Sequence, residues 1–504
     1  MRSEQCPSQR QIERLVIVSN RLPIVVIQGE DGAWHVEPGS GGLVTALAPV
    51  LRDRGGVWIG WPGTSEEKEL GSLLTAGGQA VGYTLEPVPL SAEEVDGYYR
   101  GFANEIVWPL FHDVQTRCNF DPAYWEVYQS VNRKFAQVIA AHAAAGDYIW
   151  VHDYHLMLVA TYLRDLGVEQ KLGFFLHTPF PSVDIFSKLP WRQQILAGLM
   201  AYDLLGFQTT SDRNNFLGCA ESLHQVRHAD TRPRVTTMAL NHREIRVGSF
   251  GISIDFDEFD RQARAPAVVE RTRALREEMP DGKIILGVDR LDYSKGIPER
   301  LKAFERALKR FEELRGKVTF VQVAVPSRVE IPEYQQLRAE IEGLVSRING
   351  RFTESGWVPI HYLFRSLDRS ELVALYRAAD IALITPLKDG MNLIAKEYCA
   401  ANVEHNGVLI LSEFAGAARR LGRHVLLVNP YDLDGVADAI RDAYHMSRTE
   451  RQSRMRRLRR VIRTRNIFWW LDTFLNASFP RDLDTVPTLS GANPLHLDPD
   501  ASGG

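Results

Sequence analysis

The 504-residue sequence lacks the features of several special classes of protein. Its four cysteines (Cys6, Cys118, Cys219 and Cys399) are scattered, unlike a disulfide framework or a zinc site. Its formal net charge of −4 argues against a field that attracts nucleic acid. Its apolar runs are too short to cross a membrane, and its polar first residues lack the apolar core of a secretory signal. We therefore expect a cytoplasmic globular protein without nucleic-acid or membrane partners.

Strand-like apolar runs alternate with amphipathic helical stretches along the chain. Runs such as 148–153, 172–177, 284–289 and 381–385 are nearly continuous in apolar residues, as strands covered on both faces of a parallel sheet require. The strands fall into two sets that divide near residues 240–255. The pattern predicts two α/β domains with a ligand cleft between them, because ligands gather at the carboxyl ends of parallel strands and at domain interfaces.

The most informative segment is residues 385–397, TPLKDGMNLIAKE. It reads as the end of a buried strand, a turn at Asp389 and Gly390, and a helix over 392–400. Free N–H groups and the dipole at the beginning of a helix attract phosphate. Glu397 lies about one turn into this helix, where a carboxylate can accept hydrogen bonds from a ribose. An ordinary strand-turn-helix unit is the alternative interpretation.

Basic side chains follow strands in both halves of the chain. Arg290 and Lys295 lie in the loop segment GVDRLDYSKG, where two cations could neutralise a diphosphate leaving group. Arg21 and Arg328 occupy equivalent strand-end positions and could clamp a second phosphate, since a guanidinium binds phosphate bidentately. The arginine-rich run 451–465 is interpreted as a solvated helix face, with a polyanion surface as the alternative.

Polar and aromatic side chains near other strand ends suggest a sugar site. His152, Asp153 and His155 end one strand and His177 ends another. A zinc site is disfavoured, because motifs of that kind place two histidines on one helical face beside further ligands. Short polar side chains can instead hydrogen-bond sugar hydroxyls. The aromatic residues that could face a sugar ring are Trp61, Tyr99 and Trp108.

Three motifs are discounted as signals of other chemistry. Gly41 and Gly42 lie in GSGGLV, which lacks the third glycine of a dinucleotide fingerprint, although they could let the backbone approach a phosphate or sugar. Residues 255–257, DFD, spell the DxD of metal-dependent glycosyltransferases without a supporting ligand cluster. Residues 482–486, DLDTV, resemble an aspartyl phosphatase motif, but we expect too few residues after them for such a domain.

The chain closely resembles retaining glycosyltransferases of the trehalose-6-phosphate synthase family, family GT20. Ten segments between residues 15 and 479 carry the resemblance, in the family's order: SNRLP, SGGL, WIGWPG, YYRGFANEIVWPLFH, VHDYHLM, GFFLHTPFPS, LLGFQT, VDRLDYSKGIPER, TPLKDGMNLIAKEY and LSEFAGAA. The resemblance implies a GT-B fold, in which two facing Rossmann-like domains hold the active site in the cleft between them. It also implies transfer of glucose, with retention, from a nucleoside-diphosphate glucose to glucose 6-phosphate, giving α,α-trehalose 6-phosphate without a metal or other cofactor.

The resemblance also implies roles for individual residues. The acceptor glucose 6-phosphate would be bound by Arg21, Tyr99, Trp108, Asp153 and Arg328. The donor would be bound by Gly41, Gly42, His177, Arg290, Lys295, Leu367, Asp389, Gly390, Met391, Asn392, Leu393, Ile394, Ala395, Lys396 and Glu397. The catalytic set would be Arg290, Lys295, Asp389 and His177. The leaving diphosphate itself would accept the proton of the incoming hydroxyl, so the two cations of that set stabilise the charge that grows on it.

Several expectations remain open. Leu367 stands where an aromatic residue can border the base, so uracil is the first choice and guanine stays an alternative. We expect a flexible N-terminus over 1–14, an acceptor domain over 15–248, a nucleotide-sugar domain over 249–465, a C-terminal helix over 466–480 that crosses back, and a mobile tail over 481–504. A homo-oligomer is conceivable. The alternative functions are a transferase with another acceptor, such as a glucosylglycerol-phosphate synthase or a pseudo-glycosyltransferase, and a non-catalytic sugar-phosphate sensor.

Overall fold

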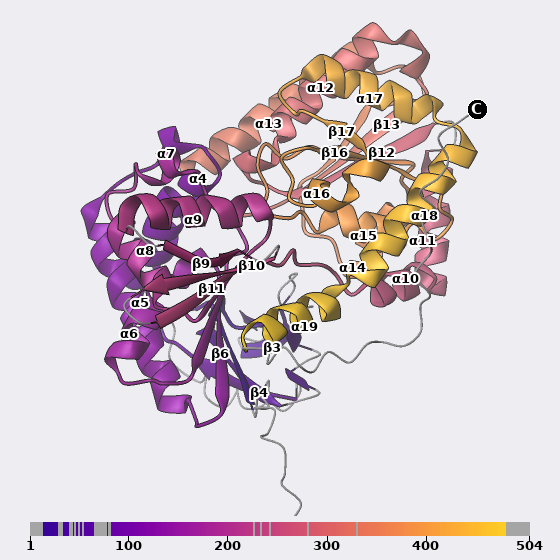
Figure 1. The fold of residues 1–504 in the computed structure, drawn as a ribbon. Helices are drawn as coiled ribbons and strands as arrows, with labels where there is room; N and C mark the ends of the chain where they lie inside the picture. Colours follow the sequence, from indigo (N-terminus) through magenta and orange to yellow (C-terminus); the bar gives the residue numbers. More distant parts are fainter. Residues whose placement is uncertain are drawn as a thin grey trace, which may run out of the picture.

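Two lobes make up the part of the chain that the structure, a computed structural model, describes (Figure 1). The described residues are 14–479 except 29–33, 40–43, 45–46, 49–50, 53–54, 65–77, 79–81, 225–226, 232–233, 241–242, 280–281 and 329–330. Gly41, Gly42, the first thirteen residues and the predicted tail therefore lie outside the described residues. No helix within the described ranges is long and apolar enough to cross a membrane.

The first lobe is built on a nine-stranded sheet with the order β5-β4-β1-β6-β7-β8-β11-β10-β9. Its strands are β1 (Arg14–Arg21), β4 (Gly56–Trp61), β5 (Thr84–Pro87), β6 (Asp147–His152), β7 (Lys171–Phe175), β8 (Leu204–Phe207), β9 (Arg227–Thr231), β10 (Val235–Leu240) and β11 (Arg243–Ser249). The strands from β5 to β11 are parallel, and β10 and β9 continue the sheet antiparallel. A separate hairpin joins β2 (Ile24–Gln28) to β3 (Trp34–Pro38).

Helical segments cover this first sheet (Figure 1). They are α3 (Ala92–Glu94), the π-helical segment η1 (Val95–Val107), α4 (Trp108–Phe111), η2 (Gln115–Arg117), α5 (Pro122–His142), η3 (Tyr154–Leu156), α6 (Val159–Asp165), α7 (Val183–Phe186), α8 (Arg192–Met200) and α9 (Thr210–His224). Every residue of β6 is buried, as its unbroken apolar run predicts for a central parallel strand.

The second lobe contains a six-stranded parallel sheet with the order β14-β13-β12-β15-β16-β17. Its strands are β12 (Lys283–Arg290), β13 (Val318–Val325), β14 (Ile360–Leu363), β15 (Ile381–Ile384), β16 (Val408–Ser412) and β17 (Leu426–Val428). Its helical segments are α10 (Phe256–Ala263), α11 (Pro266–Glu278), η4 (Tyr293–Lys295), α12 (Ile297–Arg310), η5 (Glu312–Leu314), α13 (Pro332–Phe352), α14 (Arg369–Ala378), α15 (Ile394–Ala401), α16 (Ala418–Leu421), η6 (Gly422–His424) and α17 (Leu433–His445).

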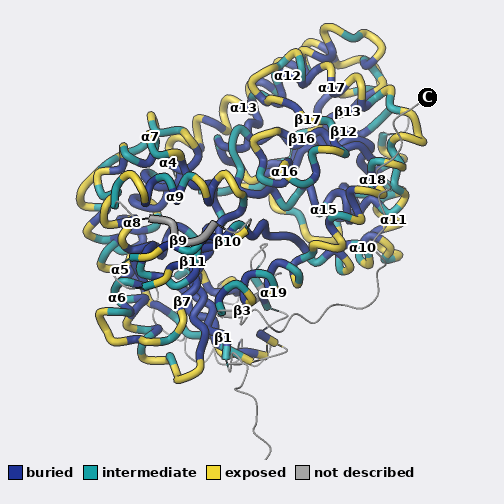
Figure 2. Tube along the Cα trace, viewed as in Figure 1, coloured by how far each residue is buried: buried dark blue, intermediate teal, exposed yellow. Residues whose placement is uncertain are grey.

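Both sheets contain the strand order of a Rossmann fold. Numbered by their place in the chain, the six strands of the second sheet, and β1, β4, β5, β6, β7 and β8 of the first, follow the order 3-2-1-4-5-6. The order reverses between β1 and β6 in one lobe and between β12 and β15 in the other. Ligand crevices form outside the carboxyl ends of strands at such switch points. Figure 2 shows the central strands as the buried interior of each lobe, whereas the edge strands β5, β14 and β17 are only partly buried.

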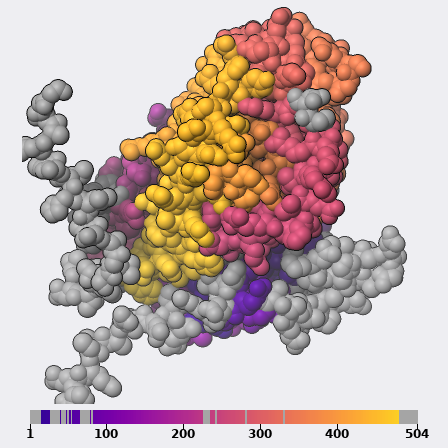
Figure 3. Space-filling view, turned by 90° about the vertical axis from the view of Figure 1, so that its right-hand side faces the viewer, coloured from indigo at the N-terminus to yellow at the C-terminus, as the bar shows by residue number. Residues whose placement is uncertain are grey.

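Two C-terminal helices connect the lobes. Helix α18 (Arg448–Thr464) packs on the second lobe, and α19 (Ile467–Ala477) lies on the first (Figures 1 and 3). Trp470 and Phe474 of α19 stack on Trp150 of β6, with ring centroids 5.1 Å and 4.2 Å away. The indole N–H of Trp470 also donates to the carbonyl oxygen of Phe250 over 3.1 Å. Burial of these large aromatic faces fixes α19 on the first lobe, after the chain has crossed over from the second lobe.

The arginine-rich run on α18 is only partly a solvated face. Arg459 is buried, and its guanidinium donates to the carbonyl oxygens of Cys399 and Ala400 and pairs with Asp260. The DFD motif is structural as well, because the Asp255 side chain caps α10 by accepting from the Glu258 N–H over 3.1 Å.

Candidate active site between the lobes

A cavity of about 760 Å³ lies between the lobes, at the carboxyl ends of the central strands. It brings together most of the residues predicted from the sequence, namely Arg21, Tyr99, Trp108, Asp153, His177, Arg290, Lys295, Arg328, Leu367, Asp389, Met391, Asn392, Leu393, Ile394 and Glu397. Gly390, Ala395 and Lys396 do not line it. Residues more than 350 positions apart in the chain therefore share one site, as the paired switch points require.

The turn after β15 is held in place by a largely buried ion pair. The Lys295 ammonium lies 2.7 Å from the Asp389 carboxylate, and the two side chains are 11% and 13% exposed. Asp389 also accepts from the Met391 N–H and the Asn392 side-chain amide, each over 3.2 Å. Burial by itself would raise the pKa of Asp389, but the Lys295 charge and these hydrogen bonds lower it below its usual range. Asp389 is therefore ionised at neutral pH.

The backbone of this turn needs the residue types that the motif contains. A Cβ on Gly390 would lie 2.3 Å from the carbonyl oxygen of His177, so only glycine permits this approach of the lobes. Asn392 adopts a φ of 70°, in the left-handed region that asparagine tolerates. Its side-chain oxygen accepts from the Ala395 N–H over 3.0 Å, so α15 begins at Ile394 rather than at Asn392 as predicted.

A buried arginine that the sequence analysis missed supports Lys295. Arg300 has a fully buried side chain that pairs with Asp289 and donates to the Thr385 hydroxyl over 3.0 Å. It also donates to the carbonyl oxygen of Lys295 over 3.1 Å and to Gln322 over 3.1 Å. One guanidinium thus ties β12, β13 and β15 to the loop that carries Lys295. Its position on the apolar face of an amphipathic helix was the available signal, since arginine is rarely buried unless paired.

The predicted acceptor arginines are positioned by aromatic rings. The Arg328 guanidinium lies 4.5 Å from the ring centroid of Trp108 and 3.4 Å from Asp292. The Arg21 guanidinium lies 4.7 Å from the ring centroid of Trp61. Stacking of this kind orients a guanidinium while leaving its N–H groups free to meet an anion.

The positive charge of this region contributes to the pKa shifts of two buried groups. Burial, followed by the charges of Arg328 and Arg21, lowers the pKa of His155 to about 3. Although burial opposes it, the charges of Arg328, Lys295 and neighbouring cations bring the pKa of Asp292 to about 2. Asp292 was also missed from the sequence, although it lies in the same DYSKG loop as Lys295. Cations of this region therefore contribute to both shifts.

Asp153 and His177 meet beside these cations. An oxygen of the Asp153 side chain accepts from the His177 backbone N–H over 3.2 Å, and Asp153 itself has a φ of 75°. Desolvation raises the pKa of Asp153 to about 6, although hydrogen bonds to backbone N–H groups and the charge of Arg290 oppose the rise. Burial lowers the pKa of His177 to about 3. The imidazole is therefore neutral, and its Nε2 lies 3.2 Å from Nδ1 of the equally neutral His152.

The side chains at the beginning of α15 point to opposite sides. Glu397 lines the cleft and accepts from the Tyr376 hydroxyl over 2.9 Å, and burial raises the pKa of this carboxyl. Lys396 instead donates to the carbonyl oxygen of Ile252 and lines a different cavity. A helix turns by about 100° per residue, so Lys396 and Glu397 extend in different directions, and the bond to Ile252 fixes the direction of Lys396. Lys396 therefore does not reach the cleft.

The arrangement places several cations and hydrogen-bonding groups around one cavity. Arg290 and Arg328 both lie near the ring of Trp108, 5.7 Å and 4.5 Å from its centroid. Within the described part of the chain, no three histidine, cysteine or carboxylate side chains form a metal-binding group.

The whole described chain is similar to known glycosyltransferases. The family model for glycosyltransferase family 20 matches residues 13–478. The trehalose-6-phosphate synthase of Mycobacterium avium is 45% identical over 480 residues, which cover 93% of this chain and 96% of that protein. The bifunctional trehalose-6-phosphate synthase/phosphatase of Thermoproteus tenax is 42% identical over 92% of this chain, and the match spans 63% of that longer relative.

Solved structures resemble the fold over nearly its full length. The UDP-forming α,α-trehalose-phosphate synthase of Burkholderia xenovorans, in complex with glucose 6-phosphate, has a TM-score of 0.83 at 37% identity and covers 92% of this chain and 100% of its own. An Escherichia coli structure of the trehalose-6-phosphate protein bound with UDP-2-fluoro glucose also has a TM-score of 0.83 at 37% identity, over 92% of this chain and 98% of its own.

Proposed function

Because the chain belongs to glycosyltransferase family 20, we propose that it transfers glucose with retention from UDP-glucose to glucose 6-phosphate and forms α,α-trehalose 6-phosphate. Two similar structures support the choice of substrates, since one was solved with glucose 6-phosphate and the other with UDP-2-fluoro glucose. The substrates are small molecules that fit the cavity of about 760 Å³.

One observation carries the proposal: two pairs of cations line the same cleft. Arg290 ends β12, and Lys295 follows it and pairs with Asp389. Arg21 and Arg328 extend from the two lobes over aromatic rings. A transferase that joins a nucleoside-diphosphate sugar to a sugar phosphate needs two such groups, one for each anion.

The donor would lie along the second lobe. Glu397, fixed by Tyr376, would accept hydrogen bonds from the ribose hydroxyls. The diphosphate would meet Arg290, Lys295 and the N–H groups of Leu393 and Ile394, where α15 begins. Neutral His177 and ionised Asp389 would hydrogen-bond the glucose hydroxyls. Leu367 would border the base.

The acceptor would lie against the first lobe. Its phosphate would bind Arg21 and Arg328, with Tyr99 and Trp108 shaping the sugar pocket. Asp153 would accept a hydrogen bond from an acceptor hydroxyl, and its raised pKa makes this interaction sensitive to mild acid.

In the transfer itself, the bond between the anomeric carbon and the diphosphate oxygen breaks while the acceptor hydroxyl attacks from the same face. The proton of that hydroxyl moves to the departing diphosphate oxygen. Arg290 and Lys295 stabilise the negative charge that grows there, which lowers the barrier more than it favours the bound substrate. These two side chains supply the positive charge that a divalent ion supplies in metal-dependent transferases, so the proposal includes no metal or other cofactor.

The test is nucleotide release from UDP-glucose and from GDP-glucose, each with and without glucose 6-phosphate, with the sugar product identified by NMR. We expect release that depends on glucose 6-phosphate, a non-reducing disaccharide phosphate, and faster turnover with UDP-glucose. Faster turnover with GDP-glucose would overturn the donor assignment. Turnover only with another acceptor, such as glycerol 3-phosphate, or no turnover, would overturn the synthase assignment.

A matched pair of variants links the reaction to the cleft. Lys295→Met should abolish most turnover, whereas Lys388→Met should retain it. Lys388 lies on the same loop as Asp389 but pairs with Asp113 outside the cleft lining. Equal losses in the two variants would contradict a specific role for Lys295.

A further inference from the structure

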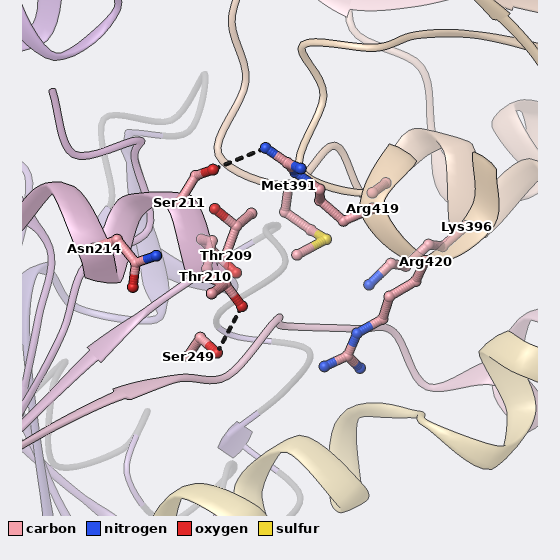
Figure 4. A pocket seen from close by; sticks show the side chains of 12 residues that line it. Thr209, Thr210, Ser211, Asn214, Ser249, Met391, Lys396, Arg419 and Arg420 are labelled. Carbon is pink, nitrogen blue, oxygen red and sulfur yellow. Dashed lines mark hydrogen bonds between the residues drawn. The ribbon is translucent and has the colours of Figure 1, made fainter. Parts of the chain in front are cut away.

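A second cavity, of about 470 Å³, lies between the lobes beside the cleft. Gln208 and Met391 line both spaces, so these two side chains separate them. Figure 4 shows Thr209, Thr210 and Asn214 on one side of the second cavity and Lys396, Arg419 and Arg420 on the other. One wall therefore consists of uncharged polar groups of the first lobe, and the opposite wall of cations of the second.

The charge in this cavity has one sign. Its charged lining residues are Lys396, Arg419 and Arg420, and no described carboxylate lines it. Within the described ranges neither arginine forms an ion pair with an acidic side chain, and Arg420 lies close to further cations. Arg420, Arg234 and Arg465 all lie over the ring of Trp469, 5.1 Å, 5.6 Å and 5.5 Å from its centroid.

The lowered pKa values of Arg420 and Lys396 agree with a cluster of positive charges that no described carboxylate neutralises. Burial, followed by the charges of Arg465 and Arg234, lowers the pKa of Arg420 to about 10. Burial and the charge of Arg420 lower the pKa of Lys396 to about 7. Like charges that lie close together and partly buried repel one another unless an anion balances them. A bound anion would offset this repulsion.

The uncharged wall offers hydrogen bonds to a ligand that carries hydroxyl groups. The Thr210 and Ser249 hydroxyls lie 3.5 Å apart on this wall. Ser211 already accepts a hydrogen bond from the Arg419 guanidinium over 2.8 Å, which joins the two lobes across the cavity (Figure 4). A molecule that touched both walls would reinforce that contact.

We propose that this cavity is an effector site for a small phosphorylated metabolite with hydroxyl groups, which clamps the two lobes together and changes the affinity of the cleft for its donor. Arginine forks suit a phosphate group because they bind it bidentately. The hydroxyl groups of the same molecule would meet Thr210 and Ser249.

The cavity is mechanically connected to the catalytic turn. The segment that leads into Arg419 and Arg420 is hydrogen-bonded to that turn, from the Gly416 N–H to the Asp389 carbonyl over 3.0 Å and from the Ala417 N–H to the Met391 carbonyl over 2.8 Å. A Cβ on Gly416 would lie 1.9 Å from the Gly390 carbonyl oxygen, so the two segments are in the closest possible contact. Movement of the cationic wall would therefore displace the turn that pairs with Lys295.

The test uses glycerol 2-phosphate as the probe and isothermal titration calorimetry on the full chain. Glucose 6-phosphate belongs to the proposed ligand class and is left out, and the titrations use Arg21→Gln as the background, which removes one of the two guanidinium groups of the acceptor position and so weakens binding of the probe in the cleft. We expect one saturable site for glycerol 2-phosphate, weaker binding of inorganic phosphate, and none of glycerol. Absence of a saturable site would overturn the proposal, and so would binding of inorganic phosphate as tight as that of the ester.

Variants locate the site and its effect. Arg420→Gln should weaken probe binding roughly tenfold or more, since it removes a charged hydrogen-bond donor. Arg423→Gln, an exposed neighbour that does not line the cavity, is the matched control and should bind like the wild type. Thr210→Val tests the opposite wall should Arg420→Gln fail to fold. Unchanged binding in both wall variants would overturn the assignment.

The kinetic arm measures the donor KM with and without the probe. The probe should change this KM in the wild type and in Arg423→Gln but not in Arg420→Gln. Binding that left the KM unchanged would overturn the effector role. Because the binding arm needs no turnover, its outcome is independent of whether the proposed transfer reaction is correct.

Discussion

The buried pair of Lys295 and Asp389 should have a structural role and a catalytic role that can be separated. Replacing Lys295 by Met leaves the Asp389 carboxylate in a space where its side chain is 13% exposed and without its cation. Removing one partner of a buried pair costs about 3–5 kcal/mol of stability. Asp389→Asn should cost a similar amount, because it leaves the ammonium unpaired.

The double variant Lys295→Met/Asp389→Asn should recover most of that stability. It removes both charges, and an asparagine side chain can still accept from the Met391 N–H and the Asn392 amide. If the double variant costs about 2 kcal/mol, the double-mutant cycle should therefore give a coupling energy of about 4–8 kcal/mol. Turnover should not recover. Loss of a transition-state cation lowers kcat roughly 10²–10³-fold, whether or not the fold is repaired.

The pH dependence of stability gives a second measure of the pair. In the wild type, Lys295 keeps the pKa of Asp389 low, so the pair stabilises the fold above the unfolded pKa and that contribution is lost as pH falls. In Lys295→Met, burial alone should raise this pKa, so stability relative to the double variant should fall as pH rises.

Urea unfolding and steady-state nucleotide release on the four proteins would measure both effects. Equal stability losses that simply add in the double variant would refute the pairing argument. Turnover that returned together with stability would refute the catalytic role of Lys295.

Three further predictions concern the cleft and the C-terminal helix. Tyr376→Phe removes the hydrogen bond to Glu397, so steady-state kinetics should show the donor KM rising roughly tenfold with little change in kcat. The folded protein holds a proton on Asp153 up to a pKa of about 6, whereas the unfolded chain releases it near the ordinary value of 3.8. Its stability relative to Asp153→Asn should therefore fall by up to about 3 kcal/mol as pH rises from about 4 to about 6, as urea unfolding at a series of pH values would measure. Trp470→Ala empties a fully buried site beside Trp150 and should cost about 3–5 kcal/mol in the same assay, whereas an exposed-site control, Phe468→Ala, should cost little.

Much of the fold could be predicted from the sequence, because its strands and turns depend on the residue types in short segments. Strands such as β6 and β15 are continuous apolar runs, and such runs are stable only where helices cover both faces of a parallel sheet. The turn at Asp389 and Gly390 could also be predicted from the sequence, because its backbone geometry permits only certain residue types. The prediction of an α/β protein of the GT-B class, with two Rossmann-like domains around a cleft, is confirmed.

The direction of single side chains depended on contacts that no local pattern encodes. Within the segment 393–397, Glu397 faces the cleft while Lys396 faces the second cavity, and the difference is set by where Ile252 and Tyr376 lie. The burial of Arg300 likewise needs three strand ends to meet around it.

The sequence by itself determined the α/β class and the order of the elements, because apolar periodicity and turn chemistry act over a few residues. The resemblance to a known family, carried by short motifs, implied most of the residues at the cleft. Only the tertiary structure decided which side chains pair across the lobes and which face each cavity. Those choices arise from packing between segments hundreds of residues apart, as for Arg419 and Ser211, whose separation along the chain is 208 residues. Their free energies depend on burial and charge in the assembled molecule, which the local sequence does not contain.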